Sequence, residues 1–116
     1  AGKSNATNVY YTTPFSTKAS ATNKLASNFM SAYKAKYGST APTFSALAYD
    51  SVYMIKAAIE KEGSANSVKI ADGLAKLKNF KGVTGTTTIN KQHNPEKTIS
   101  IEQLTNGAVS KVYNVK

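Results

Sequence analysis

Side chains able to act as acids, bases, nucleophiles or metal ligands are sparse in this chain. His93 is the only histidine, it lies in a polar stretch beside Asn94 and Pro95, and cysteine is absent. A protein zinc site needs several histidine, cysteine or carboxylate ligands held together, and His93 has no such partner at ligand spacing. We therefore expect no metal site.

The carboxylates offer no catalytic pair either. Of the six, four fall on expected helix ends, helix surfaces or a strand face, where solvation or ion pairing explains them, and Glu96 lies in a polar turn. A serine hydrolase of the strand-turn-helix type would carry a G-x-S-x-G motif, which the sequence lacks. A small hydrolase is thus the least favoured function, and we expect no enzyme and no cofactor. The six carboxylates are Asp50, Glu60, Glu62, Asp72, Glu96 and Glu102.

Two glycines, Gly82 and Gly85, lie where the sequence changes from a helical to an extended pattern. Their G-x-x-G spacing lacks the lysine and the serine or threonine of a phosphate-binding loop, and no strand precedes it. Glycine is favoured where the backbone needs positive φ, so the pair predicts a turn.

Phe44, Tyr49 and Asp50 form the most suggestive group, because all three lie in the first turns of an expected helix. Backbone N–H groups and the helix dipole favour a ligand carboxylate at a helix start, and Phe44 is placed to contact an apolar ligand side chain. The simpler interpretation makes Tyr49 a core residue and Asp50 an acid near a positive helix end. The residues alone favour that simpler interpretation.

The elements that would position this group begin with a strand over Asn8–Thr13, which is rich in β-branched and aromatic residues. A helix follows, capped by Ser20, Thr22 or Asn23 and ended by Gly38. Apolar residues recur along it at helical spacing and predict one buried stripe. The stripe comprises Leu25, Ala26, Phe29, Met30, Tyr33 and Tyr37.

The second expected helix, Phe44–Glu62, ends at Gly63 and is apolar on nearly every side. Such a helix is normally buried on several sides, and the rest of this chain can hardly supply so many neighbours. We therefore expect the chain to be part of a larger protein. The apolar positions are Leu47, Tyr49, Val52, Tyr53, Met54, Ile55, Ala57, Ala58 and Ile59.

A third helix is capped by Asn66 or Ser67 and contains Gly73, which costs about 1 kcal/mol relative to alanine inside a helix. Beyond Phe80 the pattern predicts a strand over Thr86–Asn90 and a polar turn over 91–97. The inner face of the third helix comprises Val68, Ile70, Ala71, Leu74 and Leu77.

The chain closes with an antiparallel hairpin, because Asn106–Gly107 is a strong signal for a two-residue type I′ turn. The fold class is therefore α/β, with the order β-α-α-α-β-β-β. A two-residue loop fixes the register. The expected cross-strand pairs are Leu104 with Val109, Glu102 with Lys111, and Ile101 with Val112.

Length and charge limit the function further. The 116 residues make at most one domain, and the net charge is +9, with 15 lysines and no arginine. A basic domain suggests nucleic-acid binding. Two features argue against it: the chain has no arginine, which supplies the bidentate contacts of sequence-specific proteins, and its lysines are scattered along the sequence. A solvated surface is favoured, with attraction to anionic envelope polymers as an intermediate possibility.

The order and spacing of six segments resemble the C-terminal part of the substrate-binding proteins of ABC importers. The resemblance is to the branched-chain amino acid (leucine/isoleucine/valine) type, of the type I periplasmic-binding fold, and runs from about Val9 to Val115. The central segment reads F-S-A-L-A-Y-D, and another reads F-K-G-V-T-G. The six segments are Val9–Ser16, Phe29–Gly38, Phe44–Asp50, Ile70–Leu74, Phe80–Ile89 and Asn106–Gly107.

The resemblance implies a partial domain over residues 1–116, from a protein with two lobes. Residues 8–15 would form a strand and a hinge crossing, residues 20–80 the helical part of lobe one, and residues 84–116 the closing strands of lobe two. Phe44, Tyr49 and Asp50 would line the ligand cleft.

The resemblance further implies an extracellular or periplasmic receptor, anchored in its intact form as a lipoprotein. It would capture an amino acid and deliver it to an ABC permease. The alternative from another class is a free-standing basic module that binds envelope polyanion or nucleic acid.

The uncovered second helix also predicts self-association of the isolated chain. Exchange of the terminal β segments between two copies is the most economical route, since both ends are strands. The segments Pro14–Ala19 and Lys81–Gly85 would act as the hinges of that exchange.

Overall fold

A computed structural model describes residues 3–18 and 23–115 of the chain. Among these residues, no helix is both long and apolar enough to cross a membrane. The helical elements are η1 (Lys3–Asn5), α1 (Lys24–Tyr37), α2 (Thr43–Glu62) and α3 (Ser67–Ala75). The strands are β1 (Val9–Thr13), β2 (Phe80–Gly82), β3 (Gly85–Ile89), β4 (Pro95–Lys97), β5 (Ile99–Thr105) and β6 (Ala108–Val115).

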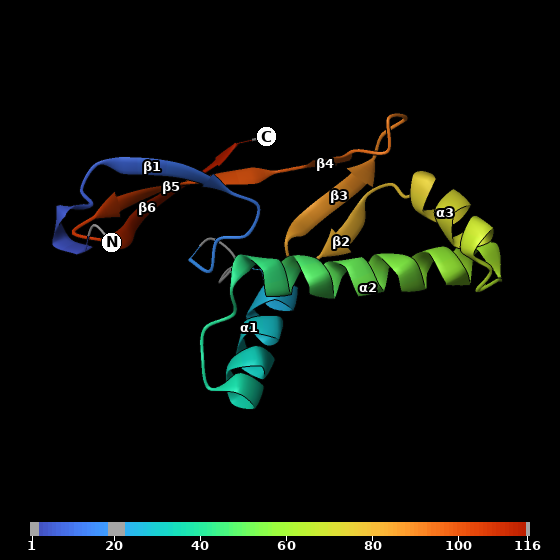
Figure 1. Ribbon diagram of the computed structural model, residues 1–116, viewed down its shortest axis with the longest axis horizontal. Helices are drawn as coiled ribbons and strands as arrows, with labels where there is room; N and C mark the ends of the chain where they lie inside the picture. Colours follow the sequence, from blue (N-terminus) through green and yellow to red (C-terminus); the bar gives the residue numbers. More distant parts are fainter. Residues whose placement is uncertain (1–2, 19–22, 116) are drawn as a thin grey trace.

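The strands form two antiparallel sheets of three strands each, in the orders β1-β5-β6 and β2-β3-β4. Figure 1 shows the β1-β5-β6 sheet at one end of a molecule that measures 52 × 33 × 25 Å, α3 at the other end, and the strands β2 and β3 between them above α2. The α/β class and the order of elements follow the prediction. Two short strands, β2 and β4, are additional, and β4 occupies the end of the expected polar turn.

Local capping explains where the helices begin and end. Asn23 accepts hydrogen bonds through its side chain from the amides of Leu25 and Ala26 at the start of α1. Gly38 and Gly63 follow α1 and α2 with φ of 72° and 63°, as expected for left-handed helix ends. Of the alternative caps, Ser20 and Thr22 lie outside the described residues.

The core of the helical side lies where α1, α2 and the β2–β3 turn meet. Phe15 and Phe29 pack edge to face there, with ring centroids 6.2 Å apart. Small residues allow the close approach of the helices, and Val83 closes the cluster from the turn. The buried members are Phe15, Ala26, Phe29, Ala41, Ala46 and Val83.

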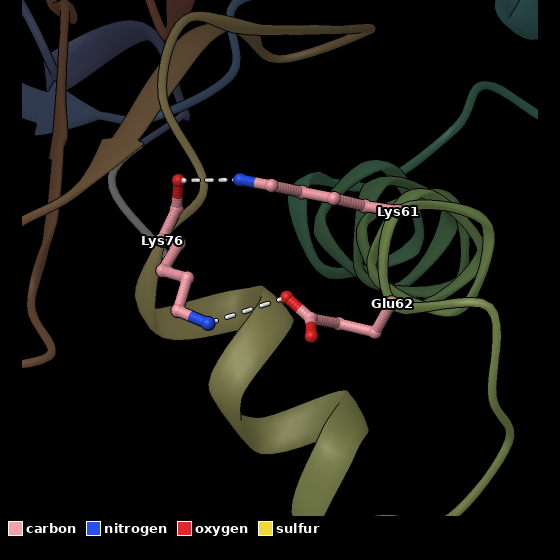
Figure 2. A network of polar contacts seen from close by, with 3 residues as sticks. All are labelled: Lys61, Glu62 and Lys76. Carbon is pink, nitrogen blue, oxygen red and sulfur yellow. Dashed lines mark hydrogen bonds and ion pairs between the residues drawn. The ribbon is translucent and has the colours of Figure 1, made fainter.

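Contact between α2 and α3 explains Gly73. A Cβ atom at Gly73 would lie 2.9 Å from the Cβ of Ala58, so glycine permits the two helices to touch. Polar contacts close the same end of the pair (Figure 2): Lys61 Nζ donates to the Lys76 carbonyl, and Lys76 Nζ lies 3.4 Å from Glu62 Oε1. The helical cost of Gly73 is thus offset by packing.

The terminal hairpin has the predicted turn, with φ of 52° at Asn106 and 78° at Gly107. The predicted register is confirmed only next to the turn, where Leu104 faces Val109. The pairs expected farther along are wrong by one residue. Glu102 faces Val112, Gln103 faces Lys111, and Ile101 faces Tyr113.

The shift arises from Ser110, which has no partner residue on β5 and forms a bulge. Its hydroxyl donates to the Gln103 carbonyl at 3.1 Å and accepts from Thr105 Oγ1 at 2.9 Å. Lys18 Nζ donates to the Ser110 carbonyl at 2.9 Å. These bonds satisfy the extra residue, and the bulge places Val112 instead of Lys111 opposite Glu102.

Tyr11 on β1 faces Glu102 on β5, and its hydroxyl donates to Glu102 Oε2. This hydrogen bond, together with burial and the nearby carboxylate charge, raises the pKa of Tyr11 to about 12. The folded state holds the phenolic proton of Tyr11 more tightly than the unfolded state does. The hydrogen bond from Tyr11 to Glu102 therefore contributes fully to stability below pH 10, and this contribution is lost as the pH rises through about 12.

We expect Glu102→Gln to lower the pKa of Tyr11 toward its ordinary value, since the charged acceptor is removed. The ring carbon shifts of Tyr11, followed by NMR against pH and assigned with Tyr11→Phe, measure this change. Glu96→Gln, at an exposed position of β4, is the matched control. A Tyr11 titration unchanged in Glu102→Gln would contradict the pairing.

Candidate functional site

A pocket of about 840 Å³ opens between α1, α2 and β2. Its walls are one face of α1 from Leu25 to Tyr37, one face of α2 from Ser45 to Tyr53, and the segment Phe80–Val83. Most of these side chains are apolar, so the pocket suits an apolar occupant better than a charged one.

Five aromatic rings run in sequence along the walls on α1 and α2. Centroid distances are 4.6 Å from Tyr37 to Tyr33, 5.9 Å from Tyr33 to Phe29, 4.9 Å from Phe29 to Tyr49, and 4.8 Å from Tyr49 to Tyr53. Tilted aromatic pairs of this kind contribute about 0.5–1.5 kcal/mol each beyond the area they bury. The Phe29–Tyr49 pair joins the two helices, and the other three pairs lie within α1 or α2.

The structure brings two of the three predicted site residues to this pocket. Tyr49 lines it, and its hydroxyl donates to the Tyr53 hydroxyl at 3.3 Å. That hydrogen bond, followed by burial and nearby negative charge, raises the pKa of Tyr49. Asp50 lies at the inner edge, whereas Phe44 is 84% exposed and is not part of the wall.

Asp50 is buried, and its carboxylate is held by the turn between β2 and β3. Oδ1 accepts from the amide of Val83 at 2.7 Å, and Oδ2 accepts from the amide and hydroxyl of Thr84 at 2.9 and 2.6 Å. A Cβ atom at Gly82 would lie 2.4 Å from Asp50 Oδ2, so only glycine fits. Gly85 has φ of 102°, which confirms the turn expected there.

Sequence reasoning missed Lys97 at the end of β4. Its ammonium donates to Thr84 Oγ1, and the side chain is half-buried. Burial lowers the pKa of Lys97, while the charge of Asp50 acts in the opposite direction. The only sequence signal was a lysine at the end of a polar turn, which ordinarily indicates solvent exposure.

The described residues contain no group of three histidine, cysteine, aspartate or glutamate side chains that could hold a metal ion. His93 has φ of 63° and lies in the exposed β3–β4 turn. The site therefore consists of an apolar pocket with a buried polar cluster at its edge.

Two sheets joined by two crossings, with helices beside one of them, define the class: a part of a type I periplasmic-binding fold. Residues 1–108 match the profile of the family described as Periplasmic binding protein, and the chain belongs to that family. The resemblance seen in the sequence is thereby confirmed. A search of curated proteins gives no significant match.

Two solved structures that this chain resembles are amino acid-binding proteins. The substrate-binding protein LivJ from Streptococcus pneumoniae, in complex with isoleucine, has a TM-score of 0.85 and 41% identity, over 97% of this chain and 32% of that one. The leucine-binding protein LivK from Thermotoga maritima has a TM-score of 0.80 and 32% identity, over 96% and 32%. The chain thus spans about a third of the length of either structure.

Proposed function

We propose that this chain is the C-terminal part of an extracellular or periplasmic receptor that captures an amino acid for an ABC importer. The observation that carries the proposal is 41% identity over 97% of the chain to a receptor whose structure holds isoleucine. The intact receptor would deliver its ligand to a permease and would be held at the membrane by a lipid anchor. A free-standing polyanion-binding module is not favoured, because the relatives are solute-binding proteins.

The proposed lobe boundaries are those that the resemblance implies. Residues 8–15 would form a strand and a hinge crossing, residues 20–80 the helices of lobe one, and residues 84–116 the strands that return to lobe two. The β3–β4 part of this last range pairs with β2, so it lies beside the helices. The return to the other sheet takes place at Thr98, between β4 and β5.

Among the site residues, we assign ligand contact to Phe44 and Tyr49. The exposed ring of Phe44, at the start of α2, is open to a ligand or to the other lobe. Tyr49 presents its ring to the pocket. We propose that Asp50 supports the pocket edge, because both of its carboxylate oxygens accept hydrogen bonds from the protein.

The proposal predicts that the isolated chain does not bind leucine, isoleucine or valine tightly, since it would supply only part of the cleft. Calorimetry on the 116-residue chain should detect no micromolar binding, which would correspond to about −8 kcal/mol. A chimera should restore binding, with this chain replacing the matched third of the Streptococcus pneumoniae protein. We expect its dissociation constant for isoleucine to lie within about tenfold of the parent.

Phe44→Ala in the chimera should weaken isoleucine binding about tenfold, because it removes the ring that we assign to ligand contact. The ring is exposed in this chain, so its removal should not impair folding. Tyr10→Ala, which removes an exposed ring from β1, is the matched control. A folded chimera that binds none of the three amino acids would contradict the proposed function. A chimera that binds normally with Phe44→Ala would contradict only the assignment of Phe44.

A further inference from the structure

The chain passes between the two sheets at two places that lie side by side. At the first, β1 ends at Thr13 and leads to Phe15. At the second, β4 ends at Lys97 and β5 begins at Ile99, with only Thr98 between them. Thr13 on β1 pairs with Ser100 on β5, so the two crossings lie at the same end of these two strands.

Both crossings are fastened on the helical side to the same two-residue turn. Phe15 packs in the buried cluster that contains Val83, and Lys97 donates to the hydroxyl of Thr84. The turn is in turn fixed to α2, since Asp50 accepts hydrogen bonds from the amides of Val83 and Thr84. The turn has little room to move relative to α2, because the backbone of Gly82 lies directly against the Asp50 carboxylate.

We propose that Asp50, Thr84 and Lys97 are positioning residues that lock α2, the β2–β3 turn and the second crossing into one rigid unit. Bending between the two sheets is then confined to Thr98 and to the short segment after Thr13. In the intact receptor, and resting on the proposed function, this unit would fix the pivot about which the lobes close. It would also hold Gly82 and Val83 in the pocket wall.

The chemistry of the three groups explains why they form a lock. The buried carboxylate accepts three hydrogen bonds in fixed directions, and Lys97 adds a half-buried cation close to it. Thr84 is the joint between them, because its hydroxyl donates to Asp50 and accepts from Lys97. Removing any member frees the crossing without touching the pairing within either sheet.

The absence of cysteine in the chain permits a direct test with two spin labels. Lys56→Cys on α2 and Lys111→Cys on β6 place the labels at exposed positions on opposite sides of the crossings. Pulsed dipolar spectroscopy, on labelled chain diluted with unlabelled chain, reports the distribution of distances within one molecule. We expect Lys97→Met and Asp50→Asn each to broaden this distribution about twofold.

Lys91→Met, an exposed lysine in the β3–β4 turn, is the control that should leave the width unchanged. Lys97→Arg should restore the narrow distribution, because it returns a donor and a charge to Thr84. Circular dichroism establishes that each variant is folded. If Asp50→Asn does not fold, Lys97→Met and Thr84→Val decide the result.

A distribution as narrow in folded Lys97→Met as in the parent chain would overturn the proposal. The measurement uses no ligand, so its outcome is independent of isoleucine binding by the chimera. A narrow parent distribution with broad variants would support the lock even if the chimera failed to bind.

Discussion

Replacing Asp50 with alanine is expected to lower the free energy of unfolding by about 3–5 kcal/mol. The substitution leaves the amides of Val83 and Thr84 and the Thr84 hydroxyl without their acceptor in a buried position. It also removes the negative charge that faces the half-buried Lys97. A domain of this size is stable by only about 5–15 kcal/mol, so the loss is a large share of the total.

Urea unfolding followed by circular dichroism measures this loss, at one chain concentration for all variants. Asp72→Ala on α3 is the matched control, because Asp72 is exposed, and it should change the free energy by no more than about 0.5 kcal/mol. A loss below about 1 kcal/mol in Asp50→Ala would mean that water replaces the carboxylate, and the buried network would then be of little energetic weight.

The elements that the sequence predicted well are those whose ends depend on near neighbours. Asn23 caps α1 two and three residues ahead, and Gly38 and Gly63 end their helices through their own backbone conformation. The strands β2 and β4 escaped prediction, because three residues each carry too little periodicity. Their pairing with β3, and not their composition, makes them strands.

The hairpin register likewise combines a feature set by near neighbours with one set by distant residues. The Asn106–Gly107 turn is a local signal and was confirmed, whereas the bulge at Ser110 depends partly on Lys18, which lies 92 positions away. Positions close to the turn were therefore paired correctly, and positions beyond the bulge were not. Only the folded structure brings Lys18 to the edge of β6.

The site shows why a residue can be singled out correctly and its contacts still be missed. Asp50 was selected for its place near a helix start, but its partners lie 33 and 34 positions away on the β2–β3 turn. The F-K-G-V-T-G segment predicted that turn without indicating what it holds. Lys97 carried no signal, because its burial depends on how β4 packs.

The isolated chain is expected to self-associate at micromolar concentration, because apolar side chains of α1 and α2 remain open to solvent. Val52 is 66% exposed on the pocket side of α2, and Tyr53 and Tyr37, which line the same pocket, are 45% and 58% exposed. A contiguous apolar surface of this kind marks an interaction face. In an intact receptor, the part of the protein beyond this chain would cover it.

Self-association can occur by exchange of terminal strands or by direct contact through the pocket face, and a charge introduced on the pocket face distinguishes the two routes. Exchange of terminal strands would reopen Lys81–Gly85, but Asp50 holds the centre of that segment. Direct contact through the pocket face needs no such opening. The structure therefore favours contact through α1 and α2 over the exchange expected from the sequence.

Val52→Glu should shift the association equilibrium toward monomer about tenfold, since it places a charge in the apolar contact, a change of about 1.4 kcal/mol. Val68→Glu on α3 is the matched control, because Val68 is also 66% exposed but does not line the pocket. Sedimentation over a range of micromolar concentrations measures both variants against the parent chain. Association that persists equally in both would favour strand exchange, and a parent chain that remains monomeric would show that the open face of α1 and α2 is stable in water.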